Sequence, residues 1–115
     1  MEFDRYTITL LIHREDGPKL DEQQEAAMQD AHMAHLADLA DAGHVLAAGP
    51  LFDERYRGLT IFNVSPEEAL ALTEADPTVK ADIYSTIAIP WMLPAGAMSF
   101  SPARFPRSMD EASGS

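Results

Sequence analysis

Histidine is the side chain in this sequence best suited to proton transfer at neutral pH, and His32 stands at a position that needs explaining. We expect a helix over residues 21–42. On that helix, a turn of about 100° per residue brings Met28, Leu36 and Leu39 within about 40° of one direction. His32 lies in the middle of this apolar stripe, where burial without a hydrogen bond costs roughly 1–3 kcal/mol. Two interpretations stay open: a proton-transfer site, or a structural imidazole bonded to a carbonyl or a water.

The chemistry open to such a histidine is acid–base catalysis. An unperturbed imidazole titrates at about pH 6.5, so it can take and return a proton in the cell. We find no serine nucleophile motif, no glycine-rich phosphate loop and no flavin or nicotinamide signature, so we expect no cofactor. His35 lies three residues after His32, and two histidines at this spacing can bind one metal ion. The sequence shows no third ligand at a suitable spacing. We therefore expect no metal site.

Composition and charge narrow the possible partners. The 115 residues are 46% hydrophobic, which suits one domain with an ordinary core. The 8 basic and 19 acidic residues give a formal charge of −11, which disfavours nucleic acid and anionic membranes. The apolar run from Ile8 to Ile12 is too short for a signal sequence or a membrane span. The absence of cysteine fits a reducing compartment, so we expect a cytoplasmic protein.

The order of the expected elements predicts the fold class. We expect strands over residues 6–12, 45–51, 59–64 and 83–89, and helices over 21–42 and from Ser65 to about Ala75. The first helix ends at Gly43, and Ser65-Pro66 with a following Glu68 is a strong helix start. The order β-α-β-β-α-β predicts an α+β, ferredoxin-like antiparallel sheet with two helices on one face. We assign residues 1–93 to this domain.

The side-chain pattern of the third expected strand predicts that another protein surface covers the sheet. It carries apolar or β-branched side chains on both faces, with Thr60, Phe62 and Val64 alternating with Leu59 and Ile61. A sheet with one face in water would need fewer, so we expect a second copy to cover the open face. Residues 94–115 lack a period, and we expect an irregular tail with a disordered end. In this tail, Phe100 and Phe105 are candidates for contacts with the partner.

Several short motifs, in order, resemble a known family. They are His32, Leu36, Leu39, Gly43 and Ala48-Gly49-Pro50, then Glu74-Ala75-Asp76-Pro77 and finally Ile89-Pro90-Trp91. Over roughly residues 6–92 this order is similar to the YCII-related family of small dimeric α+β barrel proteins. Members of the family are thought to hold a histidine and an aspartate in a pocket between helix and sheet. Counted from Gly43 and Gly49, the family histidine corresponds to His32 rather than His35, and the family aspartate corresponds to Asp76.

The resemblance implies a function and a site. A related member is a dehydrochlorinase that acts on a hydroxylated aromatic, so we expect cofactor-independent acid–base catalysis of the lyase, isomerase or dehydrochlorinase type. Its catalytic residues would be His32 and Asp76, in a homodimer acting on a small molecule. The side chains or backbone expected to bind the substrate are those of Gly49, Pro50, His35 and Arg55.

Alternatives to this assignment remain open. An Asp before a Pro is a common helix N-cap, so capping alone would explain Asp76, although one carboxylate can do both. Gly49 would equally serve the turn that follows it. For the whole protein, the competing interpretations are a non-catalytic ligand-binding or accessory module, and a haem or metal protein, because other dimeric α+β barrels bind haem.

Overall fold

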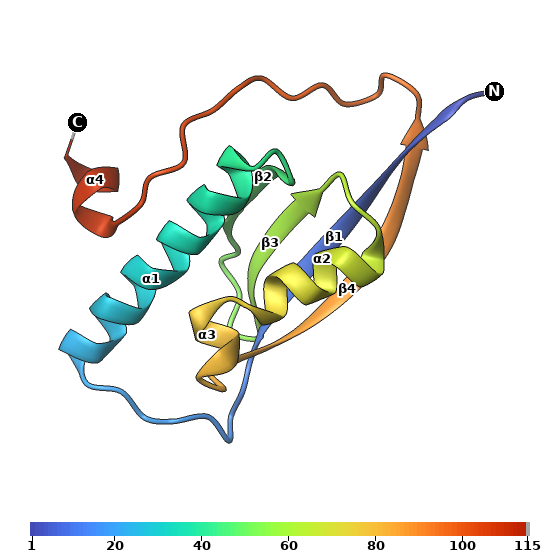
Figure 1. Ribbon diagram of the computed structural model, residues 1–115. Coiled ribbons are helices and arrows are strands. Elements are labelled where there is room, and N and C mark those ends of the chain that lie inside the picture. The colour runs from blue at the N-terminus through green and yellow to red at the C-terminus, as the bar shows by residue number, and fades with distance from the viewer. Residues whose placement is uncertain (115) are drawn as a thin grey trace.

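A four-stranded antiparallel sheet with helices on one face forms the body of the protein (Figure 1). The computed structural model describes residues 1–114. In chain order the elements are β1 Phe3–His13, α1 Glu22–Asp41, β2 Val45–Pro50, β3 Tyr56–Phe62, α2 Pro66–Glu74, α3 Pro77–Lys80, β4 Tyr84–Pro94 and α4 Met109–Ser113. The sheet order β2-β3-β1-β4 confirms the predicted α+β, ferredoxin-like arrangement.

Local sequence signals explain where the two main helices begin and end. The Asp21 carboxylate accepts a hydrogen bond from the backbone of Gln24, and the Gln24 side chain accepts one from the Asp21 backbone, a reciprocal cap at the start of α1. The helix ends at Asp41 with Ala42 as its C-cap, and Gly43 follows with φ +83°. The Ser65 hydroxyl caps α2 by accepting a hydrogen bond from the backbone N–H of Glu68.

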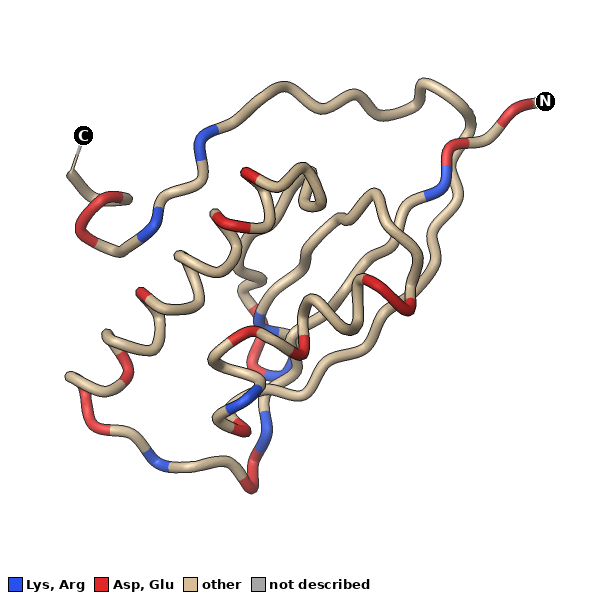
Figure 2. The backbone as a smooth tube through the Cα atoms, in the orientation of Figure 1, with Lys and Arg blue, Asp and Glu red and all other residues tan. Residues whose placement is uncertain are grey.

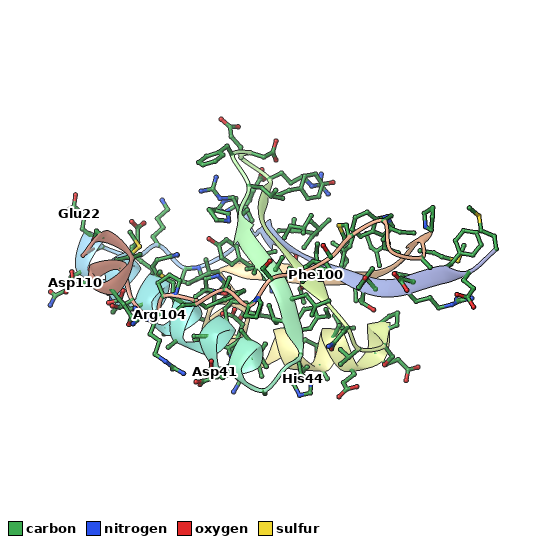
Figure 3. The ribbon with its side chains drawn as sticks, turned by 90° about the horizontal axis from the view of Figure 1, so that it is seen from above. Glu22, Asp41, His44, Phe100, Arg104 and Asp110 are labelled. Carbon is green, nitrogen blue, oxygen red and sulfur yellow. The ribbon has the colours of Figure 1, made fainter. Side chains whose placement is uncertain are left out.

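The core lies between the helices and one face of the sheet. Thr7, Thr9 and Leu11 alternate along β1 as its buried positions. Phe62 of β3 is 1% exposed and belongs to a core cluster with Leu39, Val45 and Ala69. Figure 3 shows α1 and α2 on the same side of the sheet. The helix-facing side chains are therefore buried in this chain alone.

The opposite face of the sheet is apolar, and no helix among residues 1–114 covers it (Figure 3). Residues paired across the strands share a face, so Leu10, Leu59 and Ile87 lie together there. Ile87 and Ile89 of β4 are each 42% exposed. The expectation of apolar side chains on both faces of the sheet is met, and the identity of what covers this face stays a prediction.

Three of the four strands, β1, β3 and β4, are longer than the sequence pattern indicated. We expected the last strand to end at Ile89 before Pro90, but β4 runs on to Pro94. β4 is an edge strand, and an edge tolerates proline because the missing N–H can face away from the sheet. The third strand starts at Tyr56 rather than Leu59, so the hairpin loop is shorter than expected.

Part of the C-terminal tail is helical, whereas we expected an irregular segment. Residues 109–113 form α4, capped by Ser108, and the tail runs beside α1 (Figure 1). The two aromatic side chains of the tail contact their own chain. Phe100 meets Tyr6 edge to face at 5.5 Å between ring centroids, and Phe105 packs on the core cluster. We expected the last residues of the tail to be disordered, and of these Ser115 lies outside the described residues.

Within the described residues, no helix is both long enough and apolar enough to cross a membrane.

Replacing Gly43 with alanine should lower the free energy of unfolding by about 1–2 kcal/mol, because an L side chain is strained at φ +83°. Gly49→Ala is the matched control, since an added Cβ there meets no atom within 4 Å and its φ is not positive. We expect little change in that control. Urea denaturation of both variants measures the difference, and equal losses would contradict this account of the α1 end.

Candidate functional site

The imidazole of His32 and the carboxylate of Asp76 form a close polar pair. His32 Nδ1 lies 2.6 Å from Asp76 Oδ2, although 44 residues separate them in the sequence. The side chain of His32 is 15% exposed and that of Asp76 only 3%. His32 comes from the middle of α1, and Asp76 from the junction between α2 and α3. The partner that the buried imidazole required is therefore this carboxylate.

Helix capping places Asp76 at this position. It is the N-cap residue of α3, and its Oδ1 accepts hydrogen bonds from Thr78 N at 2.9 Å and Thr78 Oγ1 at 2.7 Å. Pro77 follows at the first position of the helix. One carboxylate oxygen caps α3 while the other faces His32. Asp76 therefore has both roles that the sequence left open as geometric possibilities, a cap and a partner for the imidazole.

The environment of Asp76 favours its ionised form. Burial acts to raise the pKa of this carboxyl. The hydrogen bond and charge of His32, together with the two hydrogen bonds from Thr78, outweigh burial, and the pKa of Asp76 lies below its ordinary value. An ionised carboxylate only accepts hydrogen bonds, so the hydrogen-bond pattern assigns the proton of the shared bond to His32 Nδ1.

The other ring nitrogen of His32 is available to a ligand. No described residue forms a hydrogen bond with Nε2, and no buried side-chain nitrogen or oxygen among residues 1–114 is left without a partner. Nε2 is therefore not sealed inside the protein. With the proton on Nδ1, the lone pair of Nε2 is free to accept a proton.

His32 lines a cavity of about 320 Å³ between α1, the sheet and the tail. Leu11, Met33 and Leu36 give it largely apolar walls, and the polar lining side chains are those of Gln29, Arg57, Thr60 and Tyr84 beside His32. Gly49 and Pro50 also line it, as expected from the sequence. A mostly apolar cavity with a few convergent polar groups is the usual form of a small-molecule site.

Two residues expected at the site lie elsewhere. His35 does not line the cavity, and its Nε2 lies 2.9 Å from the carbonyl oxygen of Leu72 in α2. At about 100° per residue, the side chain of His35 leaves α1 about 300° around the helix axis from that of His32. It therefore points toward α2 instead of the cavity. Arg55 precedes β3, and its guanidinium lies 5.4 Å from the ring centroid of Tyr56. Arg55 does not line the cavity.

Arg57 is the cationic residue that lines the cavity. Leu11 pairs with Gly58 and Ile12 with Tyr56, so Arg57 is the extra residue of a β-bulge on β3. A bulge changes the direction of the side chain it carries. Arg57 Nη1 also donates to the carbonyl of Asp53 at 2.6 Å, which holds the side chain. The sequence pattern favoured Arg55 of this hairpin, and the bulge brings Arg57 to the cavity instead.

The described residues contain no group of three or more histidine, aspartate or glutamate side chains placed to hold a metal ion.

Comparisons with known proteins place the fold. The YCII-related domain matches residues 8–92. One similar solved structure is the 5-chloro-2-hydroxyhydroquinone dehydrochlorinase of Burkholderia phenoliruptrix AC1100, in complex with 2,5-dihydroxybenzoquinone. It is 21% identical over 75% of this chain and 92% of its own, with a TM-score of 0.51. At this identity the likeness shows the fold.

A second similar structure is a dimeric protein of unknown function with a ferredoxin-like fold from Bacteroides fragilis NCTC 9343. It is 17% identical over 77% of this chain and 95% of its own, with a TM-score of 0.49. A search of curated proteins gives no match.

Replacing Asp76 with asparagine should lower the free energy of unfolding by about 1–3 kcal/mol at neutral pH, because the imidazole loses its charged acceptor. The folded pKa of Asp76 lies below the ordinary value of 3.8, so the ionised carboxylate stabilises the fold above that value. This stabilisation is lost as the pH falls through the folded pKa. The difference between wild type and variant should therefore shrink as the pH is lowered below 3.8.

The matched control for this prediction is Asp53→Asn. Asp53 accepts backbone hydrogen bonds from Arg55 and Tyr56, which lower its pKa, but it is exposed and has no imidazole partner. We expect a smaller loss of stability in this variant. Chemical denaturation across the pH range measures both, and a loss for Asp76→Asn that does not change with pH would contradict the ionised pair.

Proposed function

The chain belongs to the YCII-related domain family, and on this premise we propose that it is a small-molecule enzyme that performs acid–base catalysis without a cofactor. His32 is the general acid and base, and Asp76 orients it. The observation that carries the proposal is the 2.6 Å bond between His32 Nδ1 and Asp76 Oδ2, on a residue that lines an apolar cavity and whose Nε2 has no hydrogen-bond partner among the described residues.

The reaction follows from the two nitrogens of the ring. His32 Nε2 takes a proton from an acidic C–H or O–H group of the substrate, and the electron pair of that bond stays on the substrate. The imidazolium that forms is stabilised by the Asp76 carboxylate on Nδ1. Return of the proton to another atom gives an isomerisation. Departure of chloride with the electron pair of its C–Cl bond gives a dehydrochlorination, in which the proton and chloride leave as HCl.

The cavity limits the substrate class. Its apolar walls suit a small ring, and the Arg57 guanidinium offers charge to a phenolate or carboxylate oxygen. Gly49 and Pro50 bring the backbone of β2 to the same wall. The similar dehydrochlorinase suggests chlorinated hydroquinones as the first compounds to test, because its fold is shared. His35 and Arg55 have no part in this proposal.

The second candidate function is a non-catalytic ligand-binding or accessory module. The same cavity favours it, because a 320 Å³ space with polar groups binds a small molecule whether or not a reaction follows. The two functions differ in turnover and agree in binding. The cytoplasmic location expected from the sequence stays a prediction.

We also propose that the protein is a homodimer whose two sheets face one another. The uncovered face carries Leu10, Leu59, Ile87 and Ile89, and Phe52 at the tip of the β2–β3 hairpin is fully exposed. Apolar surface of this kind is unusual on a monomer. A second copy of the same face would bury it by two-fold symmetry.

His32→Gln should reduce turnover of a chlorinated hydroquinone substrate about 10²–10⁴-fold, the usual contribution of a general acid or base. His35→Gln is the matched control, because it makes the same change one turn away and outside the cavity. It should keep most of the activity. Chloride release measures the rate, and equal rates in wild type and His32→Gln would contradict the proposed role.

Binding of 2,5-dihydroxybenzoquinone, followed by calorimetry, separates the two candidate functions. Tight binding without turnover of any chlorinated hydroquinone would favour the binding module over the enzyme.

The wild-type protein should sediment as a dimer at micromolar concentration, and Ile87→Lys should shift it to a monomer by placing a charge on the apolar face. Met92→Lys is the matched control, because Met92 lies on the same strand with its side chain on the other face and is 52% exposed. It should remain a dimer. A wild-type monomer, or equal behaviour of the two variants, would contradict the sheet-to-sheet assembly.

A further inference from the structure

The tail forms one wall of the His32 cavity. After β4 ends at Pro94, the chain passes Tyr6 and then turns along α1 toward its N-terminal end (Figure 1). Phe105, Pro106 and Met109 line the cavity, opposite the sheet residues. These three side chains are called the tail wall below. They follow the end of the family match at residue 92, so the core domain supplies the catalytic pair and the tail supplies this wall.

Polar contacts with α1 hold the tail wall in place. Arg107 Nη1 donates to Asp38 Oδ1 at 2.9 Å and Nη2 donates to Asp41 Oδ2 at 2.8 Å. The backbone N–H of Met109 donates to Asp30 Oδ1 at 2.8 Å. Figure 2 shows the basic segments of the tail next to the acidic positions of α1. Helical periodicity places these three aspartates on the face of α1 opposite His32, and the tail contacts them there.

The contacts of Arg107 are of a kind that opens readily. The Asp38 and Asp41 side chains are 68% and 75% exposed, and that of Arg107 is 46% exposed. Ion pairs this exposed contribute little stability and are screened by salt. Phe105, by contrast, is half-buried against the core cluster. Packing on the core cluster therefore fixes the tail wall at Phe105. The ion pairs of Arg107 with Asp38 and Asp41, called the Arg107 clasp below, hold the adjacent part of the wall only weakly.

We propose that the tail wall can move away from the cavity and that, when it is in place, it limits the size of the molecules that reach His32. The Arg107 clasp keeps the wall closed, and Phe105 sets how large a ring fits beside the imidazole. This inference rests on the proposed function for its biological use, because a size limit matters only to a cavity that binds ligands. Its geometry does not depend on catalysis.

The accessibility of His32 tests the clasp directly. Diethyl pyrocarbonate acylates accessible imidazole nitrogens, and peptide mass spectrometry gives the rate at each histidine of the full-length protein. Exposed His13 serves as the internal reference, and His35, bonded to Leu72, reports general unfolding. In Arg107→Gln, the rate at His32 relative to His13 should rise about twofold to fivefold, in keeping with the strength of exposed ion pairs.

Arg104→Gln is the matched control for the clasp. It removes the same charge from the tail, but the partner of Arg104 is Glu111 within the tail. We expect no change in the His32 rate. Equal rates in the two variants would overturn the clasp, and so would a parallel rise at His32 and His35, because that result would mean unfolding of α1.

The size limit is tested with a bulkier reagent. 4-Bromophenacyl bromide alkylates imidazole with loss of bromide and a proton, and its aromatic ring must enter the cavity. In Phe105→Ala, alkylation of His32 should increase more than its acylation by diethyl pyrocarbonate. Phe100→Ala is the matched control, because it makes the same change in the tail at Tyr6, away from the cavity. It should leave the ratio of the two rates unchanged.

Met109→Ala provides a second variant that leaves the core cluster untouched, since Met109 is 50% exposed and lines the cavity. It should change the ratio in the same direction as Phe105→Ala. Absence of a change in both variants would overturn the size limit. Both reagents react with His32 whether or not the protein is an enzyme, so failure of the proposed catalysis and failure of the tail wall give different results.

Discussion

The bond between His32 and Asp76 is the contact on which the arrangement of the site depends. Asp76 is 2% exposed, and a buried carboxylate without partners would be costly. Its two oxygens are satisfied from opposite directions, by Thr78 at the start of α3 and by His32 on α1. One side chain thus connects the two helical segments, and the same bond occupies Nδ1 and leaves Nε2 as the free nitrogen of the imidazole.

The cavity exists because the sheet carries small side chains where α1 crosses it. Ala48 on β2 and Gly58 and Thr60 on β3 line the floor, and larger residues there would fill the space. The side not covered by α1 or the sheet is taken by Phe105 from the tail. Core packing and site formation therefore use the same helix face, with His32 placed among residues that otherwise bury apolar surface.

The sequence supported some site residues and misplaced others for identifiable reasons. Helical periodicity was sufficient to place His32 toward the sheet, whereas Asp76 was recognised as its partner only through the family resemblance. His35 follows the same periodicity but rotates toward α2, where Leu72 accepts its hydrogen bond. Arg57 replaces Arg55 at the cavity because of a bulge, and no pattern in the hairpin sequence indicates where a bulge falls.

The sequence by itself determined the order of the strands and the two main helices, the cap at Ser65, and the helix face that carries His32, because these depend on residues a few positions apart. Only the tertiary structure decided that Asp76 meets His32 across 44 residues and that the tail closes the cavity beside them. Such contacts form between elements whose relative position depends on the packing of the whole domain, and no local period encodes that packing.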